Sequence, residues 1–509
     1  MIRRFKGELI LVVSGLCLLS ILYLFQELSL GTIYDYGYRN HVSTIGVPLD
    51  DTYIHCQYAK NLLAGHGYSF NAPDQVTADT SPLWVVLLAG GGLLTSHLEV
   101  VAVLLSALCW LLLAPGVFRF ARYALGLGYG WSLATGFLML LNARLLMMAL
   151  SGMETTLAVL LGLMAMEMHI YSRQKNAIRI REAIVIGLAL ATRPEFFLFA
   201  AILAGDWILA VRKNSILRSS LVSYFGVVAV FAVAVVSLPL SIEGKLSYHS
   251  SIVQGAGFRL IPDLFYIAKT GYIIIECYIL LLVYIGIRLI KLRQTTIPSV
   301  LLPAVLFIIA LPILQSFIAP QYRHFGRYVF IVFPFLVLCI ACAVSAICAH
   351  DGVRSRTHKI LVAVLAGIPL LLFDGRWIDL YGKAVDNIND QHLAIVDWLD
   401  HQASGNEVLA ADDVGAIAYF TNRKVLDLTG LVSPEFFPVQ HDQKEVWRLA
   451  RSKGATLFIL YTRLNPEFYA YAKDSLELVQ DFRISGPLVS SADTTMGIYK
   501  VRGAAHAAE

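Results

Sequence analysis

Charge is scarce in this sequence: only 15% of its 509 residues are charged, while 57% are apolar. Soluble domains carry about a quarter charged residues, so the composition excludes an ordinary soluble protein. The net charge of +4 is too small to indicate nucleic-acid binding. Apolar runs of about 20 residues recur, the length needed to cross a hydrocarbon core of about 30 Å. The sequence therefore predicts a polytopic α-helical membrane protein.

Cysteine pairs and a cleavage signal are also lacking. Six of the seven cysteines lie in predicted apolar spans, and only Cys56 lies in a polar loop, which excludes a disulfide framework. The spacing of Cys339 and Cys342 resembles a redox pair, but it falls mid-span, where core packing is the better interpretation. The first apolar run follows basic residues without a small-residue cleavage site, so we expect a retained span. No internal repeat or low-complexity segment is found.

Lysine and arginine cluster in six loops, which orient the spans because cytoplasmic loops collect these residues. The clusters fall near 3–6, 119–122, 173–181, 212–218, 288–293 and 354–359. Placing all six inside predicts about 11 spans. These are 9–28, 98–118, 131–150, 153–172, two short crossings between 181 and 212, 219–240, 270–290, 297–318, 327–349 and 360–376. The segment 81–95 then becomes a juxtamembrane or re-entrant helix on the outer face, with Pro82 in its first turn.

The composition divides the chain at about residue 376. Residues 1–376 form the predicted transmembrane module, with a first outer loop at about 29–97. Residues 377–509 resemble a soluble domain, in which short apolar runs at 408–411, 425–428 and 456–461 alternate with helical segments at 414–420 and 444–452. This alternation is typical of a small α/β layer. An odd number of spans places this layer outside the cytoplasm.

The first outer loop holds a long polar stretch, DDTYIHCQYAKNLLAGHGYSFNAPDQVTADTSPLW, at residues 50–84. It begins with two adjacent carboxylates, Asp50 and Asp51. A membrane protein has little reason to place so much polar sequence there unless it meets a polar substrate. The competing interpretation is an N-cap and first-turn acid for a helix that runs to about Gly65.

Further charged residues are predicted at the same outer face. Glu154 lies in the turn between two spans, Arg193 lies at a Pro-broken hairpin tip beside Glu195, and a late outer turn holds Arg323, His324 and Arg327. Carboxylates act as general bases or bind divalent cations, and arginine recognises phosphate. A substrate with a lipid tail, a phosphate and a hydroxylated head would use all these groups.

Each of these residues also has a simpler interpretation. Glu154 can serve as a helix-dipole partner, Arg193 and Glu195 can neutralise one another, and Arg323 and Arg327 can bind lipid headgroups. Asp412 and Asp413 lie in the C-terminal segment 377–509, which we call the tail. They are expected to cap a helix rather than to bind a metal.

The loop motif resembles the first outer loop of the GT-C superfamily of membrane glycosyltransferases. More narrowly, it is similar to bacterial polyprenyl-phosphate-sugar-dependent enzymes of the mycobacterial arabinofuranosyltransferase type. Supporting matches are SGME at 151–154, ATRPE at 191–195, RHFGRY at 323–328, DVGAIAYF at 413–420 and DLTGL at 427–431. The resemblance covers most of the chain in order, and the loop motif is its specific part.

The resemblance implies an inverting transfer of a sugar, such as the pentose arabinofuranose, from a polyprenyl phosphate to an envelope glycan, lipid or protein. It implies a multi-pass protein of the bacterial inner membrane, with the C-terminal domain outside. Asp50 would be the base, Asp51 and Glu154 supporting acids, and any divalent cation would be bound by these three. The implied donor-phosphate residues are Arg193, Arg323, His324 and Arg327, and the acceptor or loop residues are Tyr53, Gln57, Lys60 and His66. Relatives often carry arginine at the position of Gln57.

Two other function classes remain open. A transporter or flippase for a lipid-linked or anionic solute would also place charged residues near the membrane, although the sequence shows no pair of related halves. An envelope-assembly or sensor protein would work through its tail, but this would leave the polar loop without a purpose.

Overall fold

The computed structural model describes residues 6–29, 46–211, 218–246, 248–253, 257–292, 297–320, 324–350, 356–405, 407–461, 463–464 and 466–502. Arg323 and parts of four predicted basic loops lie outside these residues. The chain divides into two compact units. The helical unit comprises residues 1–23, 105–235 and 256–378, and the sheet unit comprises residues 24–104, 236–255 and 379–509.

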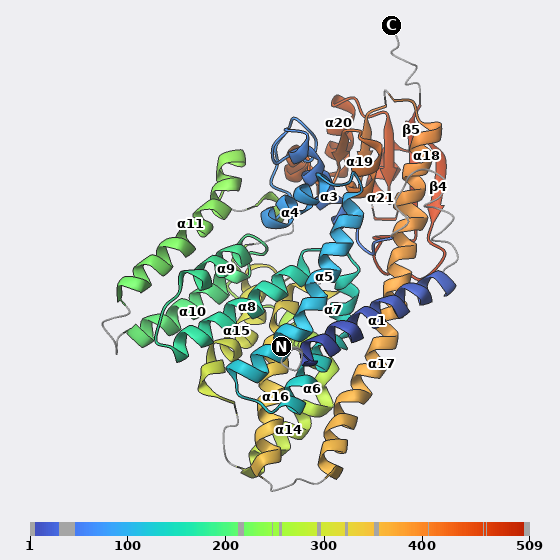
Figure 1. Ribbon diagram of the computed structural model, residues 1–509. Helices are drawn as coiled ribbons and strands as arrows, with labels where there is room; N and C mark the ends of the chain where they lie inside the picture. Colours follow the sequence, from blue (N-terminus) through green and yellow to red (C-terminus); the bar gives the residue numbers. More distant parts are fainter. Residues whose placement is uncertain are drawn as a thin grey trace. The chain divides into compact units, whose positions relative to one another are not determined.

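All secondary-structure elements that the structure describes in the helical unit are helices, with short turns and loops between them (Figure 1). They are η2 (Phe120–Ala124), α6 (Tyr129–Leu140), α7 (Ala143–Ala149), α8 (Thr155–Gln174), α9 (Ile180–Leu190), α10 (Phe196–Val211), α13 (Leu264–Ile275), η4 (Glu276–Tyr278), α14 (Ile279–Leu292), η5 (Ser299–Leu301), α15 (Leu302–Ile318), η6 (His324–Val332) and α16 (Phe333–His350). Helices α1 (Lys6–Ser29), α5 (Leu98–Arg119), α11 (Arg218–Glu243) and α17 (Arg356–Ile388) have residues in both units.

Among the described residues, seven helices are long and apolar enough to cross a membrane, or eight if one bent pair is a single span. They are 98–124, 155–174, 220–243, 264–290, 299–318, 324–349 and 360–402. The prediction of a polytopic α-helical protein is confirmed. The expected span at 9–28 forms helix α1 but is not among the seven. Three other differences from the predicted 11 spans have local causes. The expected span at 131–150 is bent by 61° between α6 and α7, and α9 and α10 have only 11 and 16 residues.

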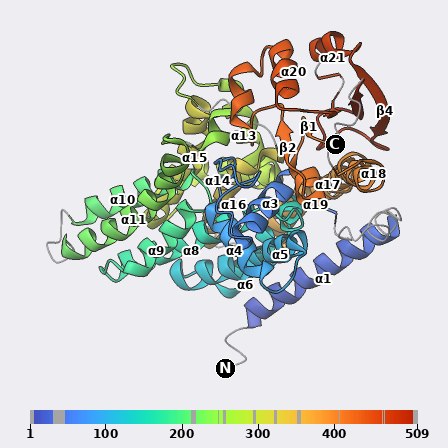
Figure 2. The same ribbon diagram turned by 90° about the horizontal axis from the view of Figure 1, so that it is seen from above.

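The sheet unit contains the described part of the polar loop and the C-terminal tail. Its helices are α3 (Asp51–Leu63), α4 (Pro82–Gly92), α12 (His249–Val253), η7 (Asn389–Leu393), α18 (Ala394–Gln402), α19 (Gly415–Thr421), η8 (Pro434–Val439), α20 (Gln443–Ser452) and α21 (Pro466–Ala472). Helix α3 ends before Gly65, whose φ of +80° favours glycine, as the sequence predicts. Helix α3 packs against both α4 and α19. Several elements of the sheet unit, among them α3 and α19, are labelled in Figure 2.

The C-terminal α/β layer is confirmed as a five-stranded sheet. Strands β1 (Leu409–Ala411), β2 (Val425–Asp427), β3 (Leu457–Leu460), β4 (Leu476–Arg483) and β5 (Thr495–Val501) lie in the order β2-β1-β3-β5-β4. The first three strands pair in parallel, and β5 pairs antiparallel with β3 and β4. One face buries Ala410, Leu426 and Phe458 against α20 and α21, which supply Val446 and Phe468. The sequence analysis did not predict β4, whose residues are mostly exposed, or β5.

Candidate functional site

The side chain of Asp50 bonds to the tail and not to its own helix. It occupies the N-cap position of α3, but its side chain makes no capping hydrogen bond there. Instead the backbone N–H of Gly415 donates to Asp50 Oδ2 at 2.7 Å, and that of Ala416 donates to Oδ1 at 2.8 Å. Capping of α3 therefore does not explain why an aspartate stands at this position. Both of its carboxylate oxygens accept hydrogen bonds from a segment more than 360 residues away in sequence.

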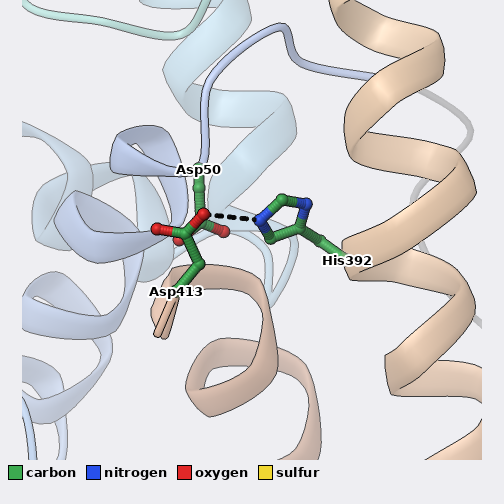
Figure 3. A group of neighbouring side chains, drawn as sticks. All are labelled: Asp50, His392 and Asp413. Carbon is green, nitrogen blue, oxygen red and sulfur yellow. Dashed lines mark hydrogen bonds and ion pairs between the residues drawn. The ribbon is translucent and has the colours of Figure 1, made fainter. Parts of the chain in front are cut away.

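Two ionisable side chains of the tail lie next to Asp50 (Figure 3). His392 belongs to η7 and is 1% exposed, and Asp413 lies between β1 and α19. The His392 Nε2 atom lies 3.2 Å from Asp413 Oδ2, and the Tyr461 hydroxyl donates to the same oxygen at 2.7 Å. No sequence pattern indicates a role for His392, and Asp412 and Asp413 are expected from the sequence to cap a helix. That expectation was wrong: the N-cap of α19 is Val414, with no side-chain capping bond.

The surroundings of Asp50 change its acidity. Burial raises the pKa of the Asp50 carboxyl to about 6, and the neighbouring Asp413 carboxylate acts in the same direction. His392 and the amides of Ala416 and Gly415 lower it. A carboxylate with a pKa near neutrality suits a general base, because it is ionised at pH 7 and still accepts a proton readily.

The same three side chains present a donor set that suits a divalent cation. One atom each from Asp50, His392 and Asp413 lie within 4.8 Å of one another. An imidazole nitrogen with carboxylate oxygens is a ligand set that Zn²⁺ accepts. The set differs from the expected Asp50, Asp51 and Glu154, since His392 and Asp413 come from the tail.

In the helical unit, Arg193 bonds two carboxylates. Its Nη1 donates to Glu154 Oε1 at 2.6 Å, and its Nη2 donates to Glu195 Oε1 at 2.7 Å. The side chains of Arg193 and Glu154 are only 4% and 3% exposed. The expected neutralisation of Arg193 by Glu195 is thus present, with Glu154 as a second partner. Glu154 stands at the N-cap of α8 and makes no capping bond there.

The late turn adopts an unusual backbone. His324, Phe325 and Gly326 all have positive φ values, of 54°, 63° and 77°. Such values are rare in residues other than glycine and mark a held conformation. Arg327 follows and is 7% exposed. The guanidinium groups of Arg193 and Arg327 lie 5.0 and 5.6 Å from the ring centroid of Tyr328, so the structure brings together two of the three predicted arginines.

Comparison with solved structures identifies the fold. ArnT from Cupriavidus metallidurans bound to undecaprenyl phosphate superposes with a TM-score of 0.60 at 12% identity, covering 89% of this chain and 94% of that one. The apo state of the same enzyme gives 0.55 at 12% identity, with 95% and 98% covered. The chain has the GT-C fold. The apo oligosaccharyltransferase from Archaeoglobus fulgidus agrees, with a TM-score of 0.52, 11% identity, and 93% and 71% covered.

Sequence comparisons add little to the GT-C assignment. Residues 386–499 match a domain of unknown function, DUF8728, and this segment contains His392, Asp413 and Tyr461. A search of curated proteins finds no match. The fold rests on the structural comparison and the multi-pass character on the apolar helices. The roles of individual residues depend on local geometry.

The four predicted acceptor or loop residues take different positions in the structure. Tyr53 is 1% exposed and stacks on Tyr419 at 6.0 Å. Gln57 donates to the Phe70 carbonyl at 3.1 Å, and Lys60 donates to the Tyr419 carbonyl at 2.7 Å. His66 is exposed. Tyr53, Gln57 and Lys60 thus tie α3 to its neighbours, and their role toward an acceptor stays a prediction.

Proposed function

We propose that the protein is an inverting glycosyltransferase that moves a sugar from a polyprenyl-phosphate donor to a cell-envelope glycan, lipid or protein. It would act on the non-cytoplasmic face of the bacterial inner membrane, with its C-terminal domain on that side. The GT-C fold supports sugar transfer, and the undecaprenyl phosphate bound to ArnT supports the donor class. A pentose such as arabinofuranose is the sugar we favour. The observation that carries the proposal is the Asp50 carboxylate, held by two tail amides within this fold.

The proposed reaction is one displacement. Asp50 removes the proton from the acceptor hydroxyl as that oxygen attacks the anomeric carbon, and the bond to the donor phosphate breaks. The phosphate leaves as an anion and needs no acid. One displacement at the anomeric carbon inverts its configuration. Asp51, the first residue of α3, would orient the start of that helix, and Glu154 would hold Arg193 in place.

Positive charge would stabilise the departing phosphate, as oriented charges do in other transfers. We favour Arg327, with His324 beside it, as the donor-phosphate residue. Arg193 already bonds two carboxylates, which offset its charge. Arg323 stays a third proposed contact.

The rival function is a transporter or flippase of a lipid-linked or anionic solute. The two functions differ in what happens to the donor's glycosyl–phosphate bond. Purified protein would be given a synthetic polyprenyl-phosphate sugar and an envelope acceptor. We expect release of polyprenyl phosphate and an inverted linkage in the product, read by NMR. Passage of intact lipid-linked sugar across a vesicle without cleavage would favour the transporter.

The transfer rate should depend on the ionisation of Asp50. A protonated carboxyl cannot accept a proton, so we expect kcat/KM to fall as the pH is lowered through about 6, the pKa of Asp50. The measurement is the transfer rate between pH 5 and pH 8, with size-exclusion chromatography at each pH to show that the protein stays folded. A rate that is flat or rises below pH 6 would contradict the assignment of Asp50 as the base.

If a divalent cation is bound by Asp50, His392 and Asp413, the Asp50 carboxylate would be a metal ligand and not a general base. A cation at this site would stabilise negative charge on the substrate, but it would take lone pairs that Asp50 needs as a base. We favour the base because burial raises the pKa of Asp50 to about 6, which suits proton transfer near neutral pH. Transfer should therefore persist in EDTA. If EDTA stops transfer, Zn²⁺ or Mn²⁺ restores it, and His392→Ala loses bound metal by mass spectrometry, then Asp50 is a ligand.

A further inference from the structure

The position of the Asp50 carboxylate is set by the C-terminal domain. Asp50 begins α3, yet its hydrogen bonds come from Gly415 and Ala416, where α19 begins. Helices α3 and α19 also pack together through Tyr53, whose ring stacks on Tyr419 and lies 5.2 Å from the Phe420 ring. The tail therefore holds both the start of α3 and the carboxylate that extends from it.

Gly415 permits this contact because it has no side chain. A Cβ atom added at Gly415 would lie 2.4 Å from the carbonyl oxygen of Asp50 and 2.6 Å from its Oδ2 atom. Both distances are shorter than a carbon atom tolerates, and the first involves backbone, which cannot rotate away. The φ of Gly415 is not positive, so backbone conformation does not require glycine here. Glycine is required at this position because Asp50 approaches too closely to leave room for a side chain.

A second part of the tail also lies beside the carboxylate. His392 lies beside Asp50 (Figure 3), and its imidazole contacts Asp413. Tyr461, which follows β3, is 1% exposed and holds Asp413 through its hydroxyl. The tail therefore supplies the side chains of His392 and Asp413 beside Asp50, as well as the two amides that bond its oxygens.

We propose that the C-terminal domain is a working part of the catalytic site: the amides of Gly415 and Ala416 fix Asp50 for proton transfer, which makes Gly415 a positioning residue. The inference rests on the proposed function and adds a role for the tail. A base misplaced by about 1 Å can lose about 100-fold in rate, because proton transfer depends on the alignment of the reacting atoms.

The first test compares Gly415→Ala with Gly405→Ala, in which the added methyl meets nothing within 4 Å. We expect kcat to fall about 10- to 100-fold in Gly415→Ala, with the donor KM within about twofold of wild type. Gly405→Ala should match wild type. Since Gly415 acts through Asp50, adding Gly415→Ala to Asp50→Asn should cause no further loss. A normal kcat in Gly415→Ala, or an equal fractional loss in both backgrounds, would overturn the inference.

A second variant covers the case in which Gly415→Ala does not fold. Asp50→Glu keeps the carboxylate but moves it by one methylene, so it cannot accept both amides in the same position. We expect a loss of about 100-fold in kcat for this variant, and wild-type kcat would refute positioning by the tail.

Failure of the inference and failure of the proposed function give different results. If wild type transfers sugar and Asp50→Asn does not, while Gly415→Ala and Asp50→Glu are normal, only the inference fails. If wild type releases no polyprenyl phosphate from any donor, the proposed function fails.

Discussion

Asp50→Asn should lower kcat for sugar transfer by about 1,000-fold, since positioned general bases contribute about 10²- to 10⁴-fold. The asparagine side chain has nearly the same shape but cannot accept the acceptor's proton. One of its two polar atoms would also point an N–H group toward an amide donor, Gly415 or Ala416, where a carboxylate oxygen now accepts. Donor binding should change far less, so the loss should lie in kcat.

The matched control is Asp74→Asn, a carboxylate in the same loop. Asp74 pairs with Lys424 at the surface, where its side chain is 66% exposed. Exposed pairs contribute little, about 0–1 kcal/mol. The control should keep wild-type activity and melting temperature. Equal losses in the two variants, or near-normal turnover in Asp50→Asn, would remove Asp50 from the mechanism.

Arg193→Ala should destabilise the helical unit by about 3–5 kcal/mol, the cost of breaking a buried ion pair from one side. The substitution leaves Glu154 and Glu195 near each other without their common cation, and their side chains are only 3% and 10% exposed. The turn that carries Arg193 joins α9 to α10, so both helices should be affected. The measurement is thermal or denaturant unfolding of the purified protein in detergent.

Arg122→Ala is the control for this stability loss, because Arg122 is exposed and donates to the nearby Leu127 carbonyl at 2.8 Å. We expect its unfolding free energy to stay within about 1 kcal/mol of wild type. If Arg193→Ala has the same unfolding free energy as the control, the ion pairs of Arg193 with Glu154 and Glu195 are not needed for stability. Arg193 would then be a better candidate for a donor-phosphate residue than we propose.

Local sequence patterns predicted a large part of this structure. Two acids before an amphipathic segment predicted α3, and a Pro-broken apolar hairpin predicted the turn that carries Arg193. Short apolar runs separated by helical segments predicted β1, β2 and β3. These features depend on residues close together in the chain, so periodicity and turn residues reveal them.

Contacts between distant segments could not be predicted from local patterns. The carboxylate of Asp50 meets Gly415 across 365 positions, and no local pattern encodes that distance. His392 is a single histidine within a helical segment, which has no distinctive spacing. The segment that begins at Asp413 matched the GT-C resemblance, but the match gave no role to Asp413 or Gly415. Only the folded sheet unit brings them to Asp50.

The most direct test of sugar transfer is the ratio of polyprenyl phosphate released to sugar joined to acceptor, measured in vesicles that contain purified protein. For wild type we expect about one polyprenyl phosphate released per sugar joined to acceptor, because one displacement breaks one donor bond for each linkage formed. We expect both products to form about 1,000-fold more slowly with Asp50→Asn in the same vesicles. Intact donor crossing the vesicle membrane without release of polyprenyl phosphate would contradict the account.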